Sequence, residues 1–164
     1  MKIKIASTQD LEFLYDEKIK NHPEDVFLPI QREKRIKSIE DGTRLFFIGF
    51  VGEECICELA ASVSNLDTFT QNKDKVLGNG CAYLFSFFTK EEYRGRGYFS
   101  KLYRFAENTL KEMGFEYLTL GVEPDDSENI ERYRKWGYTE LIYRGTEEFD
   151  GMKIDVLYYR KKLD

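Results

Sequence analysis

The sequence has little that would tie the protein to a metal, a membrane or an oxidising compartment. It holds one histidine and three cysteines in 164 residues, which is few ligands for a metal site. No apolar run approaches the length of a membrane span, and the first residues lack the apolar stretch and cleavage site of a signal peptide. We therefore expect a cytoplasmic protein with reduced cysteines, no metal and no membrane partner.

The net charge and the lack of linkers narrow the possible functions and the number of domains. The net charge of −5 at pH 7 argues against a general affinity for nucleic acid and would suit a cationic substrate. The chain has no Pro-, Gly- or Ser-rich linker, no low-complexity tract and no internal repeat. Hydrophobic residues make up 41% and charged residues 34%, as in ordinary globular proteins. We predict a single domain over residues 1–164.

Strand and helix periods alternate along the chain. The first half predicts a short strand, two helices, a hairpin of two strands and a polar loop, at residues 2–6, 8–20, 30–40, 44–51, 55–64 and 66–80. The second half predicts strand, helix, strand, short helix and a final hairpin, at residues 82–89, 98–113, 117–123, 130–136, 139–143 and 152–161. The strands at 82–89 and 117–123 are joined by a helix, so they should run parallel. The expected fold class is α/β, with about seven mixed strands and helices on both faces.

The helix after Gly97 has the clearest amphipathic pattern. Gly114 ends it, and Lys111 is favourably placed in its last turn. Its apolar residues fall on one stripe, formed by Phe99, Leu102, Tyr103, Ala106, Leu110 and Met113. We expect the helix to pack on the sheet through this stripe.

The stretch Arg94-Gly95-Arg96-Gly97 lies between a predicted strand and this helix. A turn here leaves backbone N–H groups unpaired at a helix N-terminus, where the helix dipole also favours an anion. Glycine permits a positive φ and lets a phosphate approach closely, and the arginines add charge. Taken alone, the pattern fits a phosphate site and a plain glycine turn about equally. The Walker and dinucleotide-binding patterns are both missing.

Two segments, in this order, resemble a known family. Residues 94–99 (RGRGYF) resemble the R/Q-x-x-G-x-G/A signature of the GCN5-related N-acetyltransferases, the GNAT family, in which this loop and helix bind the pyrophosphate of acetyl-CoA. Residues 129–138 (NIERYRKWGY) resemble the second motif of the family, which usually ends in Leu-Tyr-Glu-Lys-x-Gly-Phe. The predicted element order matches too. The resemblance therefore covers nearly the whole chain and implies a GNAT-like fold with acyl-CoA-dependent N-acyltransferase activity, acetyl-CoA being the co-substrate.

The resemblance implies which residues bind the cofactor. In the family, backbone amides of the loop hold the pyrophosphate, and the preceding strand supplies an oxyanion donor and pairs with the amide arm of the cofactor. Two positions depart from the pattern, because Phe99 replaces the last Gly or Ala and Asp126 replaces the usual asparagine. We expect the Phe99 ring to point into the core, and we favour a helix N-cap for Asp126. The expected cofactor-binding residues are Phe88, Thr89, Arg94, Gly95, Arg96, Gly97, Tyr98, Phe99, Ser100, Asp126 and Asn129.

The same resemblance implies that Tyr133 protonates the leaving thiolate. The general base is left open, because the strand at 82–89 carries no carboxylate where many relatives place a glutamate. Glu123 is the first candidate and Glu58 the second, each acting through water. For both residues, we favour the alternative that the carboxylate is a solvated surface charge with no catalytic role.

The sequence does not identify the molecule that accepts the acetyl group. A small-molecule primary amine is the first choice, and a protein N-terminus or lysine is the second. A non-catalytic acyl-CoA-binding module is the competing class, because the phosphate loop is present while the strand carboxylate is missing. No nucleic-acid partner is expected, and a homodimer through the last hairpin or an edge strand is left open.

Overall fold

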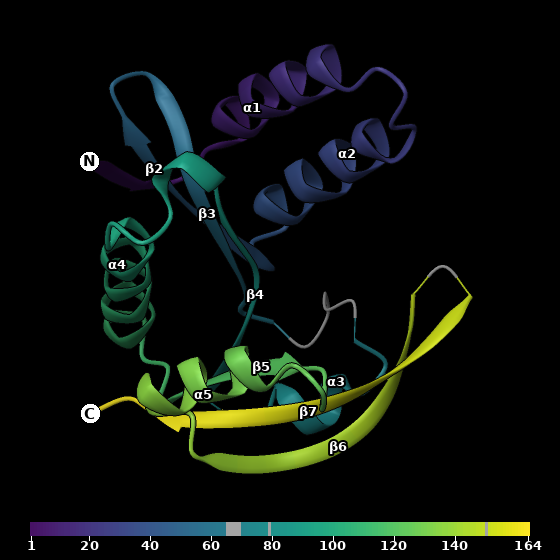
Figure 1. Cartoon of the computed structure of the whole chain (residues 1–164), viewed down its shortest axis with the longest axis vertical. Helices are drawn as coiled ribbons and strands as arrows, with labels where there is room; N and C mark the ends of the chain where they lie inside the picture. Colours follow the sequence, from purple (N-terminus) through teal and green to yellow (C-terminus); the bar gives the residue numbers. More distant parts are fainter. Residues whose placement is uncertain (65–69, 79, 150) are drawn as a thin grey trace. The chain divides into compact units, whose positions relative to one another are not determined.

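The computed structural model describes residues 1–64, 70–78, 80–149 and 151–164 (Figure 1). In these ranges seven strands form a mixed sheet in the order β1-β2-β3-β4-β5-β7-β6. Two compact units can be distinguished, one of residues 1–61 and 86–106 and the other of residues 62–85 and 107–164. The strand β4 (Cys81–Thr89) and the helix α4 (Tyr98–Glu112) each contribute to both units.

The first unit contains two helices and three strands from the N-terminal part of the chain. These are β1 (Lys2–Ile5), α1 (Thr8–Asn21), α2 (Phe27–Glu40), β2 (Arg44–Val51) and most of β3 (Glu54–Ser62). β1 pairs antiparallel with β2, and α1 packs against α2 (Figure 1). α1 begins in a capping box, in which the Ser7 hydroxyl accepts a hydrogen bond from Asp10 N–H and the Asp10 carboxylate accepts one from Ser7 N–H.

The core of the first unit lies around β2 and β3. Consecutive residues of these strands are buried, which means that both faces are covered. β2 buries Phe46, Phe47 and Ile48, and β3 buries Leu59 and Ala60. This burial on both faces explains why the two segments read as continuous apolar runs instead of alternating ones.

The second unit is built on β5 (Tyr117–Val122) and a long hairpin. The first half of β4 pairs parallel with β5, and β5 pairs antiparallel with β7 (Met152–Lys162). β6 (Glu140–Phe149) and β7 form the curved hairpin in Figure 1. The short helix α3 (Lys73–Val76) and α5 (Ser127–Lys135) complete the unit.

The α/β fold class, the parallel pairing and the final antiparallel hairpin are confirmed. Three predicted boundaries were wrong by three residues or more. α2 begins at Phe27 and not at residue 30, α5 begins at Ser127 and not at residue 130, and β6 continues to Phe149 instead of ending at residue 143. The predicted loop at 66–80 contains α3, and residues 66–69, 79 and 150 lie outside the described residues.

The apolar stripe of α4 is confirmed except at its end. Leu102, Ala106 and Leu110 are fully buried, and Tyr103 is nearly so. Met113 directly follows α4, which ends at Glu112, and is exposed. None of the described helices is long and apolar enough to cross a membrane.

A buried carboxylate joins the β6–β7 hairpin to the segment before α3. Glu147 is 2% exposed and accepts hydrogen bonds from the hydroxyls of Thr70 and Tyr158, from Asn72 Nδ2 at 2.8 Å and from Gln71 N–H at 2.6 Å. Burial by itself raises the pKa of Glu147, but these hydrogen bonds favour the charged form and lower the pKa below its ordinary value. The carboxylate therefore stabilises the second unit as an anion.

We expect Glu147→Gln to lower the free energy of unfolding at pH 7 by about 1–3 kcal/mol, because an NH₂ group then faces hydrogen-bond donors. The pKa of Glu147 is lower in the folded than in the unfolded protein, so its stabilisation is complete above the unfolded value near 4.5 and is lost as the pH falls through the folded value. Thermal unfolding curves of both proteins should therefore converge on acidification. Glu148→Gln, at the exposed neighbour, is the control, and an equal loss in both variants would contradict the prediction.

Candidate functional site

The glycine loop between β4 and α4 has the backbone conformation that an anion site requires. A single 3₁₀ turn, η1 (Glu91–Tyr93), follows β4, and Gly95 and Gly97 then adopt φ angles of +72° and +75°. Residues with a Cβ rarely take these angles. A Cβ added at either glycine would meet no heavy atom within 4 Å, so the space beside the loop backbone is open.

Among the described residues, three consecutive N–H groups of this loop make no backbone hydrogen bond. Arg94 N–H bonds to Glu91 O at 3.1 Å, and the hydrogen bond that opens α4 joins Lys101 N–H to Gly97 O at 3.3 Å. In the part of the chain that the structure describes, the N–H groups of Gly95, Arg96 and Gly97 have no backbone acceptor. Together with the first turn of α4, they form a site with positive potential that fits a phosphate.

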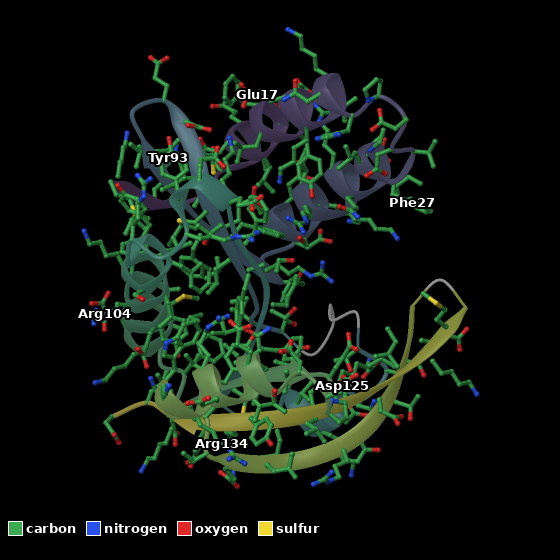
Figure 2. The ribbon with its side chains drawn as sticks, viewed as in Figure 1. Glu17, Phe27, Tyr93, Arg104, Asp125 and Arg134 are labelled. Atoms are coloured by element: carbon green, nitrogen blue, oxygen red, sulfur yellow. The ribbon has the colours of Figure 1, made fainter. Side chains whose placement is uncertain are left out.

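Side chains brace the loop against the ends of β3 and β4. The hydroxyl of Tyr93, labelled in Figure 2, donates to Glu54 at 2.8 Å, and Arg94 Nε donates to Thr89 O at 3.0 Å. The Arg96 guanidinium lies 6.0 Å from the centre of the Tyr93 ring. The loop is therefore held in place while Arg94 and Arg96 remain exposed.

The bulky residue in the signature is accommodated by packing on the strand. The Phe99 ring lies against the Phe87 ring of β4, with the ring centres 5.6 Å apart, and both residues are half-buried. The space beside Gly95 and Gly97 is open with this ring in place. A contact between Phe99 and a cofactor stays a prediction.

β4 departs from regular strand geometry at Ser86. Its φ is +54°, the one positive φ among the described residues other than glycine, and such a conformation costs about 1 kcal/mol or more. Ser86 directly precedes residues 87–89, for which the oxyanion donor is predicted, and Phe88 is exposed there. The Ser86 hydroxyl accepts a hydrogen bond from Arg35 Nη2 at 3.2 Å. A serine between phenylalanines in AYLFSFFT was the one signal in the sequence, and we missed it.

The second motif forms α5 with its own N-cap. The Asp126 carboxylate accepts hydrogen bonds from Asn129 N–H at 3.1 Å and from Asn129 Nδ2 at 2.7 Å, and Arg132 Nη1 donates to Asn129 Oδ1 at 2.5 Å. The interpretation of Asp126 as an N-cap is confirmed. Because both side chains have partners within the helix, a contact with a cofactor stays a prediction for each.

Tyr133 lies on the buried face of α5. It is 8% exposed, and its ring packs against Trp136 and Tyr138 at 5.8 and 6.3 Å between ring centres. Burial raises the pKa of Tyr133 to about 12, with a further increase from the charge of Asp126 and a decrease from Arg132. The hydroxyl therefore keeps its proton at neutral pH, as a general acid must.

The two candidate bases have different surroundings. Glu123 directly follows β5 and is exposed, while Glu58 on β3 forms ion pairs with Lys18 at 2.6 Å and Arg35 at 3.7 Å. The loop residues, Phe88, Thr89 and Glu58 belong to the first unit, and Tyr133, Asp126, Asn129 and Glu123 belong to the second. Neither glutamate is established as a base by these positions.

Solved structures with the same fold span the whole chain. A protein from Streptococcus mutans UA159 is 22% identical with a TM-score of 0.70, and covers 100% of both chains. The PaiA N-acetyltransferase of Thermoplasma acidophilum, solved in complex with coenzyme A, is 20% identical with a TM-score of 0.60 and 99% of each chain covered. A ribosomal-protein-alanine N-acetyltransferase from Brucella melitensis is 17% identical with a TM-score of 0.69, covering 99% of this chain and 100% of that one.

The amino-acid sequence also matches the model of a protein family. No curated protein matches the sequence significantly. The model of the acetyltransferase (GNAT) family matches residues 9–138, which include β4, the glycine loop, α4 and α5. The positive-φ glycines before α4 and the capped α5 lie where the two motifs of that family were expected. The chain therefore belongs to the GNAT family of acetyltransferases.

Proposed function

We propose that this protein transfers the acetyl group of acetyl-CoA to a primary amine of a small molecule. The observation that carries the proposal is the loop at Gly95 and Gly97, whose N–H groups lack backbone acceptors among the described residues. A pyrophosphate fits such a site, since it offers several anionic oxygens to N–H donors. The coenzyme A complex of the Thermoplasma acidophilum relative supports this choice of ligand.

The reaction is a direct transfer in which the amine nitrogen bonds to the acetyl carbon and the carbon–sulfur bond breaks. The amine gives up a proton to a base or to water, and the thiolate receives a proton from Tyr133. Backbone N–H groups of residues 87–89, where β4 bends after Ser86, stabilise the oxyanion that forms between these steps. No covalent enzyme intermediate is needed.

A small molecule is the first choice of acceptor, because Phe88 is exposed in the segment after Ser86 and offers an apolar surface to it. A protein N-terminus is the alternative, and the name of the Brucella melitensis relative favours it. The two acceptor classes can be distinguished by mixing a small amine and a peptide with a free N-terminus with the same acetyl-CoA, and measuring which of them is acetylated.

Gly97→Ala should weaken coenzyme A binding about tenfold or more, because a Cβ at φ near +75° forces the loop to change and its N–H groups to turn. The measurement is the rise in melting temperature on adding coenzyme A. Gly52→Ala is a matched control, since Gly52 has a φ of +61° and equally open surroundings in the turn between β2 and β3. Equal loss of coenzyme A binding in both variants would show that backbone strain in general, and not a change in the loop at Gly97, is responsible.

Tyr133→Phe should lower kcat about 10²–10⁴-fold while coenzyme A still raises the melting temperature, because the variant lacks only the proton donor. Thiol release with acetyl-CoA and a panel of amines measures kcat, and Tyr117→Phe is the control for loss of a hydroxyl elsewhere. With a pKa of about 12, Tyr133 stays protonated, so deprotonation of Tyr133 should not reduce the wild-type rate between about pH 7 and 10.

Two outcomes would contradict parts of this proposal, the first the role of Tyr133 and the second the enzyme assignment. Unchanged turnover in Tyr133→Phe would remove this residue from the chemistry. Stabilisation by coenzyme A with no thiol release on any amine, in wild-type protein as well, would identify a non-catalytic sensor.

A further inference from the structure

A half-buried group of three charged residues lies beside Ser86 in the first unit. The Arg35 cluster consists of Lys18 from α1, Arg35 from α2 and Glu58 from β3, whose side chains are 34%, 18% and 16% exposed. Lys18 Nζ lies 2.6 Å from one oxygen of Glu58, and Arg35 Nη1 lies 3.7 Å from the other. Arg35 also reaches the hydroxyl of Ser86.

The Arg35 cluster carries a surplus positive charge. Among the described residues, two cations face one carboxylate in this group, which leaves a charge of +1 on side chains that are only partly exposed. The adjacent thiol of Cys55 does not compensate for it, because burial and the charge of Glu58 raise its pKa to about 12 and keep it neutral. An anion from outside the protein would balance the cluster.

Arg35 is held in a way that leaves it able to bind such an anion. Its guanidinium lies 5.7 Å from the centre of the Tyr15 ring and 5.3 Å from that of the Phe46 ring, so its orientation is fixed by stacking. Of its five N–H donors, one bonds to Ser86 at 3.2 Å, and the Glu58 oxygen at 3.7 Å is beyond hydrogen-bond distance. Within the described residues, the Arg35 guanidinium therefore makes a single hydrogen bond.

The position of the Arg35 cluster connects it to the proposed reaction. Ser86 is the residue at which β4 bends, and it is followed directly by residues 87–89, which are proposed to hold the reacting thioester. We propose that Arg35 binds a carboxylate of the acceptor, and that the acceptors of this protein are amines that also carry a carboxylate. This inference rests on the proposed function and names the substrate class of the same site.

The net charge of −5, which would suit a cationic acceptor, does not argue against this assignment. Exposed charges are screened beyond about 8–10 Å at physiological salt, while half-buried charges act strongly on a ligand in contact with them. The two cations of the Arg35 cluster, and not the charge of the whole surface, determine which ligand is favoured there.

The test compares acceptors that differ only in the carboxylate, using several amino acids and their amides. We expect wild-type protein to prefer each amino acid over its amide by about tenfold or more in kcat/KM, after correction for the fraction of unprotonated amine. Arg35→Met keeps apolar packing on Tyr15 and Phe46, and it should raise KM for the amino acids about tenfold or more while leaving KM for the amides within about threefold.

Two further variants make the test specific. Glu58→Gln removes the carboxylate that competes for Arg35, so it should lower KM for the amino acids, which is the opposite of the effect of Arg35→Met. Lys34→Met removes an exposed cation from the same helix and should change neither KM, which excludes an effect of net charge. The Glu58→Gln result remains decisive even where Arg35→Met does not fold.

The inference is overturned while the proposed function stands if amino acids and amides are acetylated equally well, or if Arg35→Met raises both KM values alike. A fall of kcat on both acceptor types in Glu58→Gln, with no decrease of KM for the amino acids, would make Glu58 the base and would overturn the inference. Absence of coenzyme A binding and of transfer to any amine would overturn the proposed function, and the inference with it.

Discussion

The parallel pairing of β4 with β5 is the constraint from which the loop site follows. A tight turn cannot join parallel strands, so the chain returns through α4, which buries Leu102, Ala106 and Leu110. The connection from β4 into α4 turns at two glycines with positive φ. Within the described residues, that turn leaves backbone N–H groups without backbone acceptors at the start of a helix. Such an arrangement favours an anion, and two exposed arginines add positive charge to it.

Three carboxylates show how surroundings decide what a charged residue does in this protein. Glu147 is buried and is stabilised as an anion by hydrogen bonds from Thr70, Gln71, Asn72 and Tyr158. Glu58 is half-buried and ion-paired with two cations, one of which also holds the bend of β4. Glu123 is exposed at the end of a strand. The sequence made Glu123 the first and Glu58 the second candidate for a base, and the structure places the two in different surroundings.

Much of the fold was predictable because its signals are strong and regular. The apolar stripe of α4 repeats at helical spacing over three turns, and the glycine turn between β2 and β3 separates two apolar runs. α3 was missed because a single helical turn is too short to show a period. β6 was predicted too short because a register shift between Leu141 and Tyr143 interrupts its alternation and polar residues follow. The glycine loop and the N-cap at Asp126 were predictable, but the bend at Ser86 was not.

The sequence by itself determined the glycine loop before α4, the stripe of α4, the cap of α5 and the family to which the chain belongs. The loop, the stripe and the cap each depend on residues within a few positions of one another, whose spacing has a direct geometric meaning, and the family was identified from two such segments in order. Only the tertiary structure decided the partners of Glu58, Ser86 and Glu147, which lie 40, 51 and 77 positions from Lys18, Arg35 and Thr70 respectively. Over such separations the contacts of a polar side chain depend on where strands and helices pack, which no local pattern encodes.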